Sequence, residues 1–171
     1  LACNAALRDK QAQKTYMALT TGRWPTGLDV INAPLRKNVL QSGERIVVAA
    51  ADGKPSETRF QVVQAFADFS LVKAMPITGR THQIRVHMQH MGHPVFGDPV
   101  YAGRERTEGI RPEMRRRARW MLSLIKRQAL HARQLRFLHP STGKAMAFCA
   151  DWPADMSDVI EAARTREPVD Q

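Results

Sequence analysis

The sequence predicts an α+β fold in which helices flank a mixed, mostly antiparallel sheet. Extended segments at 57–66 and 70–77, and again at 130–138 and 144–150, are joined by short turn-forming stretches, as in β-hairpins. Strand-like segments also outnumber helical ones, which favours antiparallel pairing. With 171 residues, 43% of them hydrophobic, the chain is long enough for one domain with its own core.

The first third of the chain alternates extended segments with turns. Residues 14–22, KTYMALTTG, predict a strand with Tyr16, Ala18 and Thr20 on one face. In order, this part is expected to hold the end of a helix (5–13), that strand (14–22), a loop (24–27), a short extended piece (30–35), a basic and turn-rich stretch (36–44) and a second strand (45–51).

Residues 82–91 predict a short central helix, which follows the first hairpin. Thr81 is expected to be its N-cap, and Gly92 and Pro94 are expected to end it. Its expected buried stripe consists of three apolar residues at helical spacing, Ile84, Met88 and Met91.

Arg85 lies next to this stripe and is expected to point along the edge of the core, where a cleft can form. An arginine placed there can hold a carboxylate or a phosphate through two parallel hydrogen bonds, which lysine cannot do. On spacing alone, a structural salt bridge at the edge of the helix is the more common explanation.

The last third of the chain is expected to contain two helices and the second hairpin. Residues 102–128 are rich in arginine, and the part after Pro112 has a helical composition. The hairpin turns around residues 140–143. An amphipathic helix at 155–164 follows it.

The charge of the chain favours a polyanionic partner. Lys and Arg total 26 against 16 Asp and Glu, a formal net charge of +10. A merely soluble basic surface is the alternative that charge alone leaves open. Cys3 and Cys149 form neither a zinc spacing nor a disulfide framework, and no apolar run approaches ~18 residues. We therefore expect a reducing, cytoplasmic location and no membrane span.

The central segment carries a specific motif. Residues 78–87 read TGRTHQIRVH, and the triplet GHP at 92–94 and the pair GD at 97–98 follow. Shorter segments in the same order are KTY at 14–16, GKPSET at 53–58, LHA at 130–132 and HP at 139–140. Together these segments resemble the RluA class of pseudouridine synthases, which includes the RluC and RluD enzymes of the large ribosomal subunit. The stretch at 36–60 is closer to the RluC branch, whereas 97–104 and the end from 129 onward are closer to RluD.

The resemblance implies an enzyme that isomerises uridines of 23S ribosomal RNA to pseudouridine. The reaction breaks the C1′–N1 glycosidic bond, rotates the base and rejoins it through C5. The family uses an aspartate nucleophile and no cofactor, and a uridine in folded RNA must be flipped out. The implied fold is a mixed sheet with helices flanking the active-site cleft, and the intact protein is expected to be a monomer that holds no metal.

The resemblance also assigns site residues. Arg85 matches the family arginine that pairs with the catalytic aspartate. Tyr16 matches the tyrosine that packs on the target base and is a candidate for proton transfer, although a half-buried strand tyrosine is the commoner case. The remaining expected substrate contacts are Arg80, Thr81, His82, Gln83 and Ile84. A role in the core is an equally good interpretation of Ile84, and hydrogen-bonding support is an alternative for His82 and Gln83.

Two further clusters have competing interpretations. His87, His90 and His93 are spaced by three, but His93 follows the expected helix end and no cysteine is near, which argues against zinc. The basic run that precedes Trp120 is either a solvated helix face or a contact to the RNA backbone. Its arginines are Arg115, Arg116, Arg117 and Arg119.

One family element is absent from the 171 residues. The nucleophile motif, H-R-L-D ahead of the K-x-Y tyrosine, does not occur, and Asp98 is not in the nucleophile position. We therefore expect residues 1–171 to be the C-terminal part of a synthase catalytic domain without an S4-type RNA-binding domain. Such a chain alone should be inactive. A non-catalytic RNA-binding module of the same fold is the alternative function, and a generic basic domain for another polyanion is a third.

Overall fold

A computed structural model describes residues 12–104 and 110–165 of the chain. The helix end expected at 5–13 therefore lies almost wholly outside the described residues. Residue 13 is instead the first residue of a strand. Among the described residues, none of the helices is both long enough and apolar enough to cross a membrane.

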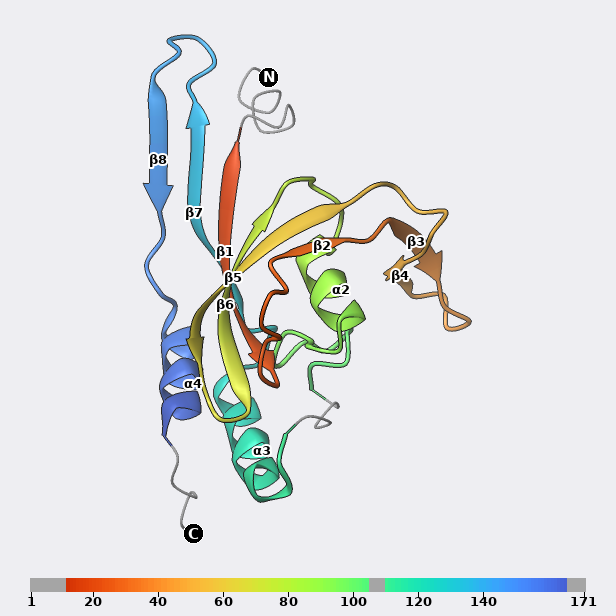
Figure 1. Ribbon diagram of the computed structural model, residues 1–171, viewed down its shortest axis with the longest axis vertical. Helices are drawn as coiled ribbons and strands as arrows, with labels where there is room; N and C mark the ends of the chain where they lie inside the picture. The colour runs from red at the N-terminus through yellow and green to blue at the C-terminus, as the bar shows by residue number, and fades with distance from the viewer. Residues whose placement is uncertain (1–11, 105–109, 166–171) are drawn as a thin grey trace.

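The centre of the molecule is a six-stranded sheet in the order β2-β5-β6-β1-β7-β8 (Figure 1). Its strands are β1 (Gln13–Thr21), β2 (Val30–Asn32), β5 (Glu57–Ala65), β6 (Phe69–Pro76), β7 (Leu130–Leu138) and β8 (Ala145–Cys149). Each neighbouring pair is antiparallel. Both expected hairpins, β5–β6 and β7–β8, are confirmed, and so is the α+β class with a mostly antiparallel sheet.

A separate two-stranded ribbon consists of β3 (Leu35–Val39) and β4 (Arg45–Ala49). The prediction of a basic, turn-rich stretch at 36–44 is wrong for β3. The sequence of this strand, LRKNV, has almost no apolar periodicity, and Leu35 is its one buried residue. Leu35 and Val47 pack against Val86 and Tyr101, so tertiary contacts make up for the missing sequence signal.

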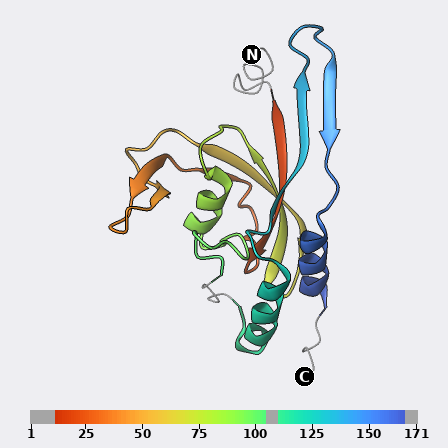
Figure 2. The same ribbon diagram turned by 180° about the vertical axis from the view of Figure 1, so that it is seen from behind.

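The helices are α2 (Gln83–His90), a 3-10 turn at Pro112–Met114, α3 (Arg115–Leu124) and α4 (Ala154–Arg164). The two C-terminal helices expected from the sequence are confirmed. Figures 1 and 2 show α3 and α4 together at one end of the sheet, opposite the tip of the β7–β8 hairpin. In both views α2 lies between the sheet and the β3–β4 ribbon.

The start of α2 differs from the prediction. His82, and not Thr81, is the N-cap, and it has a left-handed backbone with φ of 52° and no side-chain capping bond. The preceding turn is closed instead by Gln83, whose Oε1 accepts hydrogen bonds from Thr78 Oγ1 at 2.7 Å and Arg80 N at 3.0 Å. These bonds hold the turn at 78–83 in place without a conventional cap.

The buried face of α2 is also wider than predicted. Ile84 and Met88 are buried as expected, whereas Met91 lies at the C-cap and is exposed. The additional buried residues are Gln83, Val86 and His87. Gly92 has φ of 78°, so it provides the predicted helix stop through a conformation that favours glycine.

Candidate active site

A cavity of about 340 Å³ opens between β1, the end of β6, the start of α2 and the start of β7. It brings together six of the seven residues expected to form the catalytic and substrate contacts. The lining residues are Lys14, Tyr16, Pro76, Thr78, Gly79, Arg80, His82, Gln83, Ile84, Arg85, Gln128 and Leu130. We call this the Tyr16–Arg85 cavity.

Tyr16 reaches this cavity from the middle of the sheet. Its backbone lies opposite Ala74 of β6 and Ala132 of β7. The register with β7 shifts between Thr15 and Tyr16. A bulge of this kind re-aims a side chain and is often found beside active sites. Tyr16 is half-buried, which leaves part of its ring available to a ligand in the cavity.

Arg85 forms a bidentate ion pair with Asp98. Its Nε lies 2.7 Å from Oδ2 and its Nη2 lies 2.8 Å from Oδ1. The Arg85 guanidinium also lies over the Tyr101 ring, 4.8 Å from the centroid. The described part of the chain gives Nη1 no hydrogen-bond partner. The structure thus fixes the plane of the guanidinium and leaves Nη1 without a hydrogen-bond partner among the described residues.

Asp98 is fully buried behind Arg85 and does not line the cavity. Burial alone would raise the pKa of this carboxyl group. Hydrogen bonds from Arg85 and from the backbone N–H groups of Val100 and Tyr101, together with the charge of Arg85, lower the pKa of Asp98 below its usual value. Asp98 is therefore an ionised anchor for Arg85.

Tyr101 connects this ion pair to the ribbon and to the start of α2. The backbone N–H of Val47 donates to the Tyr101 hydroxyl at 3.1 Å, and that hydroxyl lies 2.9 Å from His82 Nδ1. Burial, followed by the charge of Arg85, lowers the pKa of His82. A neutral His82 that accepts the tyrosine proton at Nδ1 satisfies both observations.

Gln83 is a buried support for the site. Its Nε2 donates to the Glu57 carbonyl at 2.9 Å and to Thr58 Oγ1 at 3.0 Å. The Thr58 hydroxyl lies 2.9 Å from His87 Nδ1, and His87 Nε2 lies 3.0 Å from the Ala33 carbonyl. Both nitrogens of this buried ring are therefore engaged by the protein. The contacts of Gln83 agree with its interpretation as a hydrogen-bonding support, and the polar atoms of His87, which was considered only as a metal ligand, already have protein partners.

The other two histidines that were considered as zinc ligands are His90 and His93, and they do not face a common site with His87. His93 Nδ1 lies 3.2 Å from the Thr21 carbonyl, and His90 is exposed at the end of α2. Within residues 12–104 and 110–165, no group of three His, Cys, Asp or Glu side chains is placed to hold a metal ion.

Arg80 and Thr81 lie on the exposed turn before α2. Arg80 lines the Tyr16–Arg85 cavity, but Thr81 faces a neighbouring cavity instead. The sequence did not predict Lys14 and Gln128 as wall residues, nor Asp98 and Tyr101 as the partners of Arg85. For Asp98 and Tyr101, the only signal in the sequence was the GD pair of the motif, which lies close to α2 along the chain.

The arginine run on α3 divides into two environments. Arg115, Arg116 and Arg119 are exposed, whereas Arg117 is buried. Arg117 Nε donates to the Ala162 carbonyl at 2.9 Å, and Nη2 donates to the same carbonyl and to Thr165 Oγ1. The expectation that Arg117 contacts the RNA backbone is therefore wrong, because this side chain joins α3 to α4. Figure 1 places α3 away from α2.

Comparisons with known proteins bear on the family and the fold of the chain. Residues 2–90 match the family model described as RNA pseudouridylate synthase. The ribosomal large subunit pseudouridine synthase C of Escherichia coli K12 is 47% identical over 158 residues, which cover 92% of this chain and 47% of that protein. The protein of the same name from Salmonella typhi is 43% identical over 160 residues, covering 94% and 48%. The chain thus spans about half the length of these curated relatives.

Solved structures give the same fold. Human RNA pseudouridylate synthase domain containing 1 superposes with a TM-score of 0.66 and 27% identity, covering 89% of this chain and 59% of that chain. Human RNA pseudouridylate synthase domain containing 4 has a TM-score of 0.68, covers 96% and 67%, and is 23% identical, which bears on the fold alone.

Proposed function

The chain belongs to the RNA pseudouridylate synthase family, and on that premise we propose that it supplies the Tyr16 and Arg85 part of a catalytic site that isomerises uridine in ribosomal RNA. The observation that carries the proposal is the convergence of Tyr16, Ile84 and Arg85 on one cavity of about 340 Å³. These residues come from β1 and α2, and each has a role that the reaction requires.

The cavity fits a flipped-out uridine. The ring of Tyr16 and the side chain of Ile84 offer apolar surface on which an unpaired base can stack. Ile84 serves two purposes here, since it also belongs to the hydrophobic core. In this proposal the Tyr16 hydroxyl moves a proton as the base is detached and rejoined through C5.

Arg85 supports the nucleophile in this proposal. A carboxylate that attacks the sugar or the base must be ionised, and a guanidinium beside it favours the charged form. The ion pair with Asp98 holds Arg85 in place, so that Nη1 can meet a second carboxylate in the cavity. None of the described carboxylates lines this cavity, and we propose that an aspartate outside these 171 residues completes the site.

The proposed substrate is 23S rRNA, because the curated relatives are named for the large ribosomal subunit and for synthase C. The net charge of +10 suits a polyanion. Arg115, Arg116 and Arg119 on the exposed face of α3 are proposed contacts to the RNA backbone. We propose a cytoplasmic, monomeric enzyme that uses neither metal nor cofactor.

The decisive experiment is tritium release from rRNA labelled at uridine C5, with the full-length gene product and its Arg85→Lys variant. Lysine keeps the charge but loses the planar donor geometry, so single-turnover rates should fall by about 30-fold or more, equivalent to about 2 kcal/mol. RNA affinity should stay near that of the wild type. Arg164→Lys on α4 is the matched control, because Arg164 is exposed and pairs with Glu161.

Three outcomes separate the functions. Release by the wild type that drops in Arg85→Lys supports the enzyme. Wild-type rates in that variant would show that Arg85 has only a structural role. RNA binding without any release by the full-length protein would favour the non-catalytic module.

A further inference from the structure

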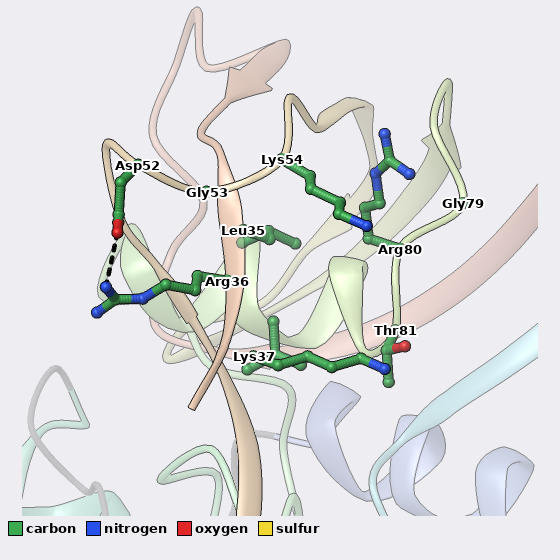
Figure 3. A pocket seen from close by; sticks show the side chains of 10 residues that line it. Leu35, Arg36, Lys37, Asp52, Gly53, Lys54, Gly79, Arg80 and Thr81 are labelled. Atoms are coloured by element: carbon green, nitrogen blue, oxygen red, sulfur yellow. Dashed lines mark hydrogen bonds and ion pairs between the residues drawn. The ribbon is translucent and has the colours of Figure 1, made fainter. Parts of the chain in front are cut away.

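A second cavity, of about 510 Å³, lies next to the Tyr16–Arg85 cavity. It is lined by the β3–β4 ribbon, the turn at 52–54 and the turn at 79–81 (Figure 3). The lining residues are Leu35, Arg36, Lys37, Val47, Asp52, Gly53, Lys54, Gly79, Arg80 and Thr81. Gly79 and Arg80 line both cavities, so the two share one wall. We call this second space the ribbon cavity.

The ribbon cavity carries an excess of positive charge. Arg36 is neutralised by Asp52, with Nη1 2.7 Å from Oδ2. Lys37, Lys54 and Arg80 make no ion pair with the described carboxylates. Figure 3 shows Lys54 pointing toward Arg80, and Lys37 pointing toward Thr81. Like charges that converge around one space repel each other, and a bound anion relieves that repulsion.

The wall that carries these cations is held by backbone contacts. Leu35 N–H donates to the Lys54 carbonyl at 2.9 Å, and Lys54 N–H donates to the Leu35 carbonyl at 2.8 Å. A Cβ at Gly53 would lie 2.6–2.8 Å from the backbone of Leu35, so only glycine permits this approach. Lys54 therefore extends from a fixed position beside the start of β3.

The ribbon itself is connected to the catalytic residues. Val47 of β4 lines the ribbon cavity and donates to the Tyr101 hydroxyl, which contacts His82 at the start of α2. Tyr101 also stacks on Arg85. The distance from the ribbon cavity to the Tyr16–Arg85 cavity is therefore set by packed side chains and hydrogen bonds.

We propose that the ribbon cavity binds a backbone phosphate of the substrate RNA, in a nucleotide next to the flipped uridine. This inference rests on the proposed function, since it places the target base in the Tyr16–Arg85 cavity. Lys37, Lys54 and Arg80 supply the positive charge, and Arg80 at the shared wall is placed between base and phosphate. Contacts of this kind position RNA without reading its sequence.

The test uses the full-length gene product and a ribosomal RNA stem-loop that contains the target uridine. A set of RNAs carries one neutral methylphosphonate linkage each, at successive positions around that uridine. Neutralising the phosphate that occupies the ribbon cavity should weaken binding to the wild type about 10-fold. The same RNA should bind the Lys37→Gln/Lys54→Gln double variant with a clearly smaller additional loss, because two of the three partner charges are already gone and only Arg80 remains.

Salt dependence gives a second readout. For the double variant, the slope of log affinity against log salt should be smaller by roughly 0.7 to 0.9 for each phosphate that the protein no longer neutralises. Lys144→Gln, in the turn between β7 and β8, changes net charge away from the cavity and should leave this slope unchanged. Asp52→Asn frees Arg36 and should strengthen binding, which a general disruption of the ribbon would not do.

The results discriminate between the two proposals. If Lys144→Gln lowers affinity and slope as much as the double variant, binding depends on net charge and the ribbon site is wrong. The ribbon site is also wrong if the double variant, compared with the wild type, loses the same affinity for every RNA of the set, whichever linkage is neutral. Selective binding of an acidic peptide in place of RNA would overturn the ribbon site as well. Binding does not require turnover, so a wild type that binds as predicted but releases no tritium would refute the synthase reaction and leave the phosphate site standing.

Discussion

Asp98 shows how one residue controls the geometry of the proposed catalytic arginine. Its side chain is 0% exposed, and it accepts both hydrogen bonds that fix Arg85. The substitution Asp98→Asn removes the charge and leaves a guanidinium that is 11% exposed without its counter-ion. We expect a loss of about 3–5 kcal/mol in the free energy of unfolding. Urea unfolding of the variant and the wild type measures it.

The pH dependence of this effect has a definite sign. The folded-state pKa of Asp98 is below its usual value, so its contribution is complete above pH ~3.9 and is lost as pH falls through the folded pKa. The difference between wild type and Asp98→Asn should therefore shrink as pH falls from about 3.9 toward the folded-state pKa of Asp98. A difference that stays constant down to the folded pKa would contradict the ion pair as its source.

The buried His87 should make the free energy of unfolding depend on pH in a second, higher pH range. Burial lowers its pKa, although the hydrogen bond to the Ala33 carbonyl opposes this shift. The unfolded state then binds protons more readily, and stability should fall as pH drops from about 6.5 toward the folded pKa. The expected slope is up to about 1.4 kcal/mol per pH unit for this one histidine.

The matched variant is His87→Gln, which keeps hydrogen-bonding groups but does not titrate. Urea midpoints at pH 7.5 and 5.5 should differ less in this variant than in the wild type. The lowered pKa of His82 contributes a slope of the same sign in both proteins, so a residual difference is expected in His87→Gln. Equal pH dependence in the two proteins would show that His87 is not the titrating group.

For single residues, the sequence predicted Tyr16, Ile84 and Arg85 as members of one pocket, and all three line one cavity in the structure. That prediction depended on the family motif, since spacing alone favoured a salt bridge for Arg85. Such a salt bridge exists, to Asp98, which lies 13 residues further along the chain. No local pattern could select Asp98 among the aspartates, because the pairing depends on the turn that brings residues 98–101 back to α2.

Among the elements, α3 offers a direct comparison between two adjacent arginines. Arg117 is buried and donates to the Ala162 carbonyl near the end of α4, whereas Arg116 is exposed. Arg117→Met should lower the free energy of unfolding by about 1–3 kcal/mol, since a buried carbonyl loses its charged donor. Arg116→Met should change it by no more than about 0.5 kcal/mol.

RNA binding should show the opposite order. Arg116→Met should reduce affinity and salt slope, because its charge lies on the proposed RNA face. Thermal unfolding and filter binding of the two variants provide both readouts. If Arg116→Met destabilises the protein as much as Arg117→Met, the assignment of Arg117 as the α3–α4 contact is wrong.

The elements that were predicted well have local signals. The β5–β6 and β7–β8 hairpins combine strand-forming residues with short turns, and Pro112 and Gly92 mark helix boundaries. The β3 strand was missed because its polar sequence gains support only from pairing with β4 and from packing against Val86 and Tyr101. The N-cap was misplaced because Thr78 and Gln83 close the turn across the expected cap.

In the molecule as a whole, the two cavities lie where the sheet, α2 and the β3–β4 ribbon meet. Sequence could indicate the chemistry of the first cavity through a motif. It could not indicate the second, because Lys37, Lys54 and Arg80 belong to separate segments that only the fold brings together. The overall charge of +10 predicts an attraction for RNA, but its distribution among these sites is a tertiary property.

The final prediction concerns the 171-residue chain by itself, which should bind RNA and release no tritium from uridine C5. The described residues that line the Tyr16–Arg85 cavity include no carboxylate, and Asp98 is sequestered behind Arg85. Tyr16 and Arg85 cannot replace the nucleophile. The phenol of Tyr16 is a poor nucleophile near neutral pH, and the guanidinium of Arg85 stays protonated. The pathway is then missing, so we expect release equal to a no-protein control while the full-length gene product is active. Asp9 lies outside the described residues, and Asp9→Asn provides the internal control: release by the chain that this substitution abolishes would identify Asp9 as the nucleophile and refute an aspartate supplied from elsewhere.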